Sequence, residues 1–210
     1  MVIGKADLFD GGKKLPVMEE FYTLQGEGFQ MGKAAYFVRI GGCDVGCTWC
    51  DTKESWDANL FPPVEVQPIV ERACQTPAKT VVVTGGEPSR YPLDYFTKSL
   101  KACGVTTMIE TAGVMPLTGK WDWVCLSPKK YSPPHASVYE LVNELKVVIQ
   151  SAADLEWAEK NAKLVSDNCL LFLQPEWSRK DEMTQEIILY IKENPDWRIS
   201  MQTHKVWGIP

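Results

Sequence analysis

Three cysteines within eight residues constrain what this chain can fold into more than any other feature. Cys43, Cys47 and Cys50 follow the spacing Cys-x3-Cys-x2-Cys in a glycine-containing loop. A loop this short can bring its thiols to one metal centre, and thiolates favour zinc, copper(I) or iron–sulfur clusters. A cubane cluster normally takes four thiolates, so three would leave one iron open, whereas a structural zinc site also needs four ligands. The spacing predicts a metal centre and leaves a zinc loop as the alternative.

Composition indicates a globular chain without the charge of a nucleic-acid-binding protein. Of 210 residues, 45% are hydrophobic and 23% charged, with 22 basic against 27 acidic residues. This composition predicts a single domain over residues 1–210. The net charge of −5 argues against nucleic acid, because duplex binding needs a concentrated basic face. We expect a cytoplasmic protein with no membrane partner, since no run is long enough to span a bilayer and Met1–Asp10 lacks a signal-peptide core.

The cysteines outside the loop lie far apart in the sequence. The total of seven is odd, and a reducing compartment suits this usage better than a disulfide scaffold does. We expect Cys74, Cys103, Cys125 and Cys169 to be buried, unpaired small hydrophobic residues.

Segments with strand and helix patterns alternate along the chain. Short β-rich runs predict strands at Ala34–Ile40, Thr80–Val83, Val105–Ile109, Asp122–Leu126, Glu144–Ile149, Cys169–Leu173 and Arg198–Thr203. Helical patterns cover Pro63–Gln75, Asp94–Cys103, Ala152–Lys163 and Asp181–Glu193, with Pro68 leaving the first helix's start open. Lys13–Phe29 is interpreted as an opening segment that carries a polar turn. The alternation predicts an α/β fold, a partial and open TIM-like barrel of mostly parallel strands.

Polar motifs follow the carboxyl ends of several predicted strands. They are Thr84-Gly85-Gly86-Glu87-Pro88, Glu110, Ser127-Pro128-Lys129 and Gln174. Because α/β barrels build their active sites at that rim, we expect these motifs and the cysteine loop to converge on one cavity. Taken singly, each motif has an ordinary alternative as a turn or a solvated side chain.

The cysteine spacing, with Trp49 before the last cysteine, resembles the signature of radical S-adenosylmethionine (SAM) enzymes. The resemblance implies a reduced form of their barrel and a [4Fe-4S] cluster on Cys43, Cys47 and Cys50. It implies that SAM binds the open iron and is cleaved to a 5′-deoxyadenosyl radical. The SAM contacts that it implies are Gly86, Glu87, Glu110, Ser127, Pro128, Lys129 and Gln174.

Five segments together resemble the 7-carboxy-7-deazaguanine synthases of the queuosine pathway. They are Leu24-Gln25-Gly26-Glu27-Gly28, Arg39, Cys50-Asp51-Thr52, Ser127-Pro128-Lys129 and His204–Pro210. The resemblance implies ring contraction of 6-carboxy-5,6,7,8-tetrahydropterin with loss of ammonia, started by hydrogen abstraction from C6. It implies a Mg²⁺ ion on Thr52, with Asp51 left unassigned. The implied substrate contacts are Leu24, Gln25, Gly26, Glu27, Arg39, Thr84, His204 and Pro210.

The same resemblance implies a homodimer and an electron donor such as flavodoxin. His135, in a predicted surface loop, has no assigned role. Two other functions remain possible from the sequence: a radical-generating activase that acts on a protein glycine, and a zinc-stabilised binding module without enzymatic activity.

Overall fold

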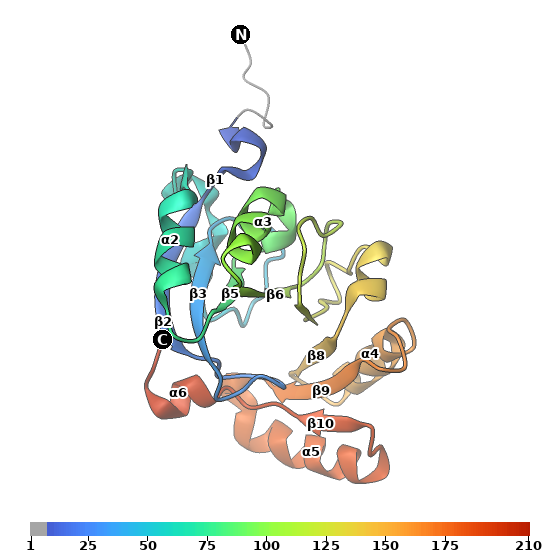
Figure 1. Ribbon diagram of the computed structural model, residues 1–210. Helices are drawn as coiled ribbons and strands as arrows, with labels where there is room; N and C mark the ends of the chain where they lie inside the picture. The colour runs from blue at the N-terminus through green and yellow to red at the C-terminus, as the bar shows by residue number, and fades with distance from the viewer. Residues whose placement is uncertain (1–7) are drawn as a thin grey trace.

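A curved sheet of eight strands organises the computed structural model, which describes residues 8–210 (Figure 1). The segment Met1–Asp10, which we expected to lack a signal-peptide core, lies mostly outside the described residues. The strands are β2 (Val17–Leu24), β3 (Ala34–Ile40), β5 (Thr80–Gly85), β6 (Thr106–Thr111), β7 (Trp123–Leu126), β8 (Glu144–Ile149), β9 (Leu170–Pro175) and β10 (Trp197–Ile199). A separate antiparallel pair joins β1 (Lys14–Leu15) to β4 (Val64–Glu65).

The strand order is β10-β9-β8-β7-β6-β5-β3-β2, and only β2 runs antiparallel to its neighbour. Because β2 and β10 are the two edges, the sheet curves without closing, which confirms the predicted α/β fold and open partial barrel. Contacts beyond the strands bridge the gap between the edges. The backbone N–H of Thr203 donates to the Gly26 carbonyl at 2.9 Å, joining the tail after β10 to the loop after β2.

Helices cover the outer side of the sheet. The α-helices are α2 (Gln67–Gln75), α3 (Asp94–Ala102), α4 (Ala153–Ala162), α5 (Lys180–Glu193) and the short α6 (Thr203–Trp207). The 3-10 turns are η1 (Asp10–Gly12), η2 (Lys53–Trp56), η3 (Ala58–Leu60), η4 (Pro88–Arg90), η5 (Ala136–Leu141) and η6 (Trp177–Arg179). Pro68 lies in the first turn of α2, where its missing N–H breaks no helical bond, so this helix begins four residues later than the predicted Pro63. None of the helices in residues 8–210 is long and apolar enough to cross a membrane.

Side chains alternate between the two faces of each strand, with the period of two that a pleated strand imposes. On β5, Val81 and Val83 belong to the large core beneath the helices, whereas Val82 packs inside the barrel with Phe37 and Met108. The next inward positions, Thr84 and Glu110, are polar and line a cavity. The barrel interior is therefore apolar at one end and polar at the carboxyl ends of the strands.

Two sequence predictions of secondary structure are wrong in part. Lys13–Phe29 contains the eight-residue strand β2 as well as the polar turn. Its charged Glu19 and Glu20 obscure the alternation, and an edge strand tolerates them because one side of it faces solvent. The predicted strand Arg198–Thr203 ends at Ile199, and Thr203 instead opens α6.

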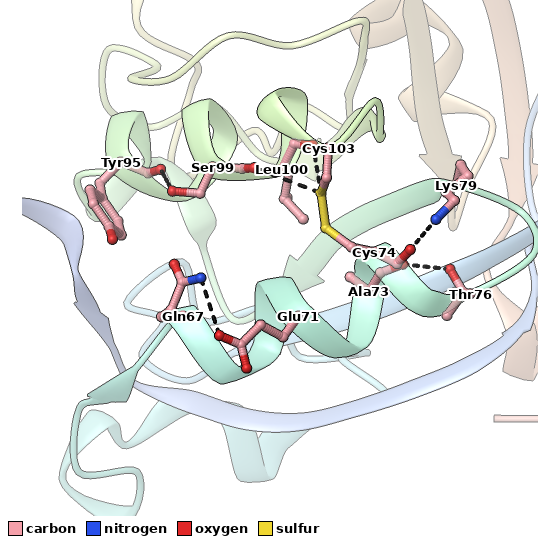
Figure 2. The surroundings of a disulfide bond; sticks show 10 residues. All are labelled: Gln67, Glu71, Ala73, Cys74, Thr76, Lys79, Tyr95, Ser99, Leu100 and Cys103. Carbon is pink, nitrogen blue, oxygen red and sulfur yellow. Dashed lines mark hydrogen bonds between the residues drawn. A yellow bond between two sulfur atoms is a disulfide. The ribbon is translucent and has the colours of Figure 1, made fainter.

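Two of the cysteines predicted to be unpaired form a disulfide (Figure 2). Cys74 lies in the last turn of α2, Cys103 is the C-cap residue of α3, and their Cα atoms are 6.2 Å apart. The bond therefore joins two neighbouring outer helices. The prediction of burial fails for this pair, because Cys74 is half-buried and Cys103 is exposed. Cys125 and Cys169 are buried free thiols, as expected.

Candidate active site

One cavity of about 240 Å³ opens at the carboxyl ends of the strands, on the rim where the sequence places its polar motifs. Most of the residues with a predicted role line it: Leu24, Gln25, Gly26, Glu27, Arg39, Cys43, Cys47, Cys50, Thr52, Thr84, Gly86, Glu87, Glu110, Ser127, Lys129, Gln174, His204 and Pro210. Pro128 is buried outside the lining, where its carbonyl accepts from the Trp157 indole N–H at 3.3 Å. The individual roles of these residues stay predictions.

The three cysteines of the metal-binding motif lie on one loop that follows β3. The backbone anchors this loop, because the N–H of Gly42 donates to the Ser55 carbonyl at 2.6 Å and that of Cys43 to the Trp56 carbonyl at 3.1 Å. Among residues 8–210, no three His, Cys, Asp or Glu side chains are arranged around a single ion. The thiolates of a cubane bind different irons, so they need not meet at one point. Three soft donors lining one cavity suit such a cluster in chemistry.

Glycines let the cysteine loop and the end of β5 approach closely. Gly85 has φ +115°, a conformation that favours glycine, and the N–H of Gly86 donates to the Ile40 carbonyl at 2.6 Å. A Cβ atom on Gly86 would meet the carbonyl oxygen of Gly42 at 2.5 Å. The Gly-Gly pair therefore holds the backbone of two cavity loops in contact.

The Glu87 side chain stabilises the site through buried hydrogen bonds. Its carboxylate is 1% exposed and accepts from the backbone N–H groups of Ser89 at 3.0 Å and Ala112 at 2.7 Å, and from the Thr111 hydroxyl. These bonds tie the end of β6 to the turn after β5. The carboxylate is thus occupied by protein donors, which leaves the backbone of Gly86 and Glu87 as the part that can face a cofactor.

Buried charges form the floor of the cavity. The ammonium of Lys146, with a side chain 4% exposed, pairs with the carboxylates of Glu27 at 2.5 Å and Glu110 at 3.3 Å. Gln25 donates to Glu110 at 2.7 Å, and its own oxygen accepts the backbone N–H of Glu27 at 3.1 Å. Glu27, Gln25 and Glu110 therefore hold fixed orientations before any ligand binds.

The pairing sets the ionisation of these groups. Burial alone would raise the pKa of Glu27, but the charge of Lys146 and its hydrogen bond lower that pKa to about 2. Burial alone would likewise lower the pKa of Lys146, but the surrounding carboxylates raise it well above its usual value. Burial lowers the pKa of His204, whose Nδ1 lies 4.0 Å from Glu27. At pH 7 the floor therefore presents an ionised Glu27 beside a neutral histidine.

Arg39 provides a further cation in the cavity lining. Its guanidinium donates to the Thr52 hydroxyl at 3.3 Å and lies over the Phe21 ring. Glu19 lies 3.3 Å from the buried Nε, yet in the described residues that atom has no hydrogen bond of acceptable geometry. A guanidinium that lines a cavity is suited to a carboxylate ligand. The Arg39 side chain lines the cavity.

Lys129 lies beside the cysteine loop. Its ammonium donates to the carbonyl and hydroxyl of Ser127, at 2.6 and 2.5 Å, and stands 5.3 Å from the centre of the Trp49 ring. Burial lowers its pKa. The alternative of an exposed turn lysine is therefore wrong, and a cation at this place would help to balance the charge of thiolates bound to a cluster.

The chain's tail covers one side of the cavity. Gln202 donates to Glu27 at 3.0 Å and to Asp51 at 3.2 Å, and Lys205 pairs with Asp51 at 3.0 Å. The tail thus contacts both the floor and the cysteine loop. Asp51, left unassigned from sequence, holds the tail in place.

Sequence reasoning missed Lys146, Gln202 and Lys205. Lys146 had a detectable signal: it is a charged residue two positions after Glu144 in an otherwise apolar strand, and this places both on the inner face. Gln202 and Lys205 had none, because their contacts with Asp51 join residues 151 or more positions apart.

Comparison with known proteins agrees with the resemblance seen in the sequence. Residues 37–168 match the radical SAM superfamily. A 7-carboxy-7-deazaguanine synthase from Flavobacterium psychrophilum is 56% identical over 95% of this chain and 94% of its own length. One from Synechocystis is 45% identical over 92% and 93%. The crystal structure of QueE from Escherichia coli superposes with a TM-score of 0.80 at 31% identity, covering 96% of this chain and 99% of that one.

Proposed function

The chain belongs to the radical SAM superfamily and, within it, to the 7-carboxy-7-deazaguanine synthases, and from this premise we propose that it contracts 6-carboxy-5,6,7,8-tetrahydropterin to 7-carboxy-7-deazaguanine. Membership implies a [4Fe-4S] cluster and SAM as cofactors, and classes the protein as a lyase. The observation that carries the proposal is the joint lining of one cavity by three thiols, the Arg39 guanidinium and a floor in which Glu27 pairs with Lys146.

The cofactors would lie on the side of the cavity formed by the cysteine loop. Cys43, Cys47 and Cys50 would hold the cluster, and the backbone of Gly86 with Ser127 and Lys129 would bind SAM. When bound, the two cofactors supply the 5′-deoxyadenosyl radical that removes hydrogen from C6 of the substrate. The protein itself provides position and excludes water.

The substrate would lie between the floor and Arg39. Ionised Glu27 can accept from the amino and amide N–H groups of a pterin, and the amide of Gln25 offers both a donor and an acceptor. The Arg39 guanidinium, which lines the cavity, would bind the substrate carboxylate. Leu24, Thr84, His204 and Pro210 would complete the contacts.

We propose that Thr52 binds Mg²⁺ together with the substrate carboxylate. Magnesium prefers oxygen ligands and keeps several waters, so one hydroxyl from the protein is chemically acceptable. The Thr52 oxygen accepts from Arg39 at 3.3 Å, and a substrate carboxylate would take over that donor. The proposal predicts weak Mg²⁺ binding without the pterin, measurable by titration with and without it, and a loss of the pterin-dependent tightening in T52V.

Oligomeric state, electron donor and compartment complete the proposal. We expect a homodimer, reduction by a flavodoxin-like donor and a cytoplasmic location. The edge strand β2 carries the exposed side chain of Tyr22, which supports a further contact surface. Light scattering of the purified protein tests the dimer, and a monomer across micromolar concentrations would exclude it.

A reconstitution assay tests the proposed reaction. Protein loaded anaerobically with iron and sulfide, then given reductant, SAM, Mg²⁺ and the carboxypterin, should form 7-carboxy-7-deazaguanine and ammonia in equal amounts. A variant with Ala at Cys43, Cys47 and Cys50 is the control and should form neither. Cleavage of SAM without a ring-contracted product would refute the substrate and leave the superfamily in place.

A further inference from the structure

A second group of polar residues lies beneath the active-site cavity and has no part in the chemistry described above. Glu144 opens β8, and its side chain is 2% exposed. It faces the barrel interior, as Lys146 does, but one layer deeper, around a small separate cavity that Trp123 and Cys125 also line. We call residues 25–30, which lie between this cavity and the main one, the recognition loop.

Glu144 anchors the recognition loop through its backbone. One carboxyl oxygen accepts from the N–H of Phe29 at 3.2 Å and from the Trp123 indole N–H at 3.1 Å. The rings of Phe29 and Trp123 stack with centroids 5.3 Å apart. The other oxygen lies 3.6 Å from the Cys125 thiol. Phe29 is therefore held to the barrel both by its backbone and by its ring.

The recognition loop packs closely against the Glu144 carboxyl at Gly28. Its φ of +64° favours glycine, and a Cβ atom there would collide with Glu144. The N–H of Gly28 donates to the Ser200 hydroxyl at 2.9 Å, which in turn donates to the Gln174 oxygen at 2.7 Å. Ser200 and Gln174 are each 3% exposed. A second buried anchor thus connects the loop to β9 and to the tail.

We propose that Glu144 and Ser200 are positioning residues for substrate recognition, which fix the recognition loop so that Gln25 and Glu27 face the pterin. The inference rests on the proposed function, because it takes this loop as the pterin-binding element. Neither residue lines the main cavity. Removal of Glu144 therefore disturbs the loop and leaves the cofactor side intact, whereas Ser200 also contacts Gln174, one of the residues expected to bind SAM.

The hydrogen bonds by which Glu144 anchors the recognition loop do not require a negative charge. Burial raises the pKa of Glu144, and the groups facing it are the Phe29 and Trp123 donors, the Cys125 thiol and the more distant Lys146 and Glu110. An amide oxygen can accept the same two N–H groups. Glu144→Gln should therefore retain the anchor, whereas Glu144→Leu should lose it.

Measuring ligand binding without turnover distinguishes a positioning role from a catalytic one. In reconstituted protein with SAM and no reductant, E144L and S200A should each raise the Kd of the carboxypterin about tenfold, the effect of losing one or two buried hydrogen bonds. In E144L the Kd of SAM should stay within about twofold, and E144Q should bind the pterin within about threefold of the wild type. E140L, the same change on the exposed surface of η5, is the matched control.

Hydrogen exchange gives a readout that needs neither cofactor nor substrate. The backbone amides of residues 28 and 29 should exchange faster in S200A and E144L, respectively, and at the wild-type rate in E144Q and E140L. S200A removes a single oxygen atom, so it decides the question even if E144L does not fold.

Three results would overturn the anchor: unchanged exchange in S200A and E144L, equal losses of pterin and SAM affinity in E144L, or an E144Q variant as impaired as E144L. A wild-type protein that does not bind the carboxypterin, with exchange altered as expected, would refute the proposed function and leave the anchoring of the loop intact.

Discussion

Replacing Lys146 with Met should destabilise the protein because it leaves two carboxylates in the cavity floor without their cation. The Lys146 side chain is 4% exposed, and those of Glu27 and Glu110 are 14% and 23% exposed. Methionine has a similar length and no charge. The change therefore tests the ion pairs more than the packing.

Two independent estimates give the size of the expected destabilisation. Removing one partner of a buried ion pair costs about 3–5 kcal/mol, and the remaining donors Gln202 and Gln25 place the expected cost near the lower end. A pKa of about 2 for Glu27, against its ordinary 4.5, corresponds to about 3 kcal/mol at about 1.4 kcal/mol for each pKa unit. K146M should therefore lower the free energy of unfolding at pH 7 by about 3 kcal/mol.

The same pair predicts a pH dependence. Because the folded state depresses the pKa of Glu27, its contribution to stability is present above pH 4.5 and is lost as the pH falls toward 2. Loss of this contribution should steepen acid unfolding of the wild type. K146M should lack that component.

Urea unfolding of cluster-free protein, at fixed redox conditions, measures both effects. K160M, which removes an exposed lysine of α4, is the matched control and should stay within about 0.5 kcal/mol of the wild type. The double variant E27Q/K146M should recover part of the loss. A K146M protein within about 1 kcal/mol of the wild type at pH 7 would show that the floor is not held by this cation.

Three further predictions follow from other parts of the structure. R39M should lower kcat/KM for the carboxypterin about a hundredfold and leave the affinity for SAM unchanged. A pterin that lacks the carboxylate should bind R39M and the wild type equally. Unequal binding of that pterin would contradict the role assigned to Arg39. Reducing the Cys74–Cys103 bond, which closes a separation of 29 residues, should lower the free energy of unfolding by about 3 kcal/mol without changing product formation, and C74S should show no such response to reductant. Deleting Pro210 should raise the Kd of the pterin several-fold in a binding titration but not that of SAM; a matching loss for SAM would place the tail on the cofactor side instead.

Local patterns were enough to predict the barrel and the place of the site. Runs such as Glu144–Ile149 are continuous and β-rich, so their strand character is visible without tertiary information. The polar motifs after Val83 and Ile109 fall at the carboxyl ends of parallel strands, and parallel pairing brings such ends to one rim. The converging cavity follows from these two facts.

What the sequence did not reveal depends on contacts between distant residues. The pairing of Cys74 with Cys103 needs α2 to lie beside α3, and nothing in either helix signals this. The link from Lys205 to Asp51 needs the tail to return across the barrel mouth. The strand β2 was missed for another reason, since an edge strand can carry Glu19 and Glu20 that a central strand would exclude.

Isotope transfer tests most directly the central claim that one cavity holds SAM beside the pterin. The reconstituted enzyme would be incubated under reducing conditions with carboxypterin deuterated at C6, and SAM and 5′-deoxyadenosine would be analysed by mass spectrometry. The account predicts deuterium in the adenosyl group, together with 7-carboxy-7-deazaguanine as product. Unlabelled 5′-deoxyadenosine formed in the presence of bound substrate would contradict it, because the radical would then have reacted elsewhere.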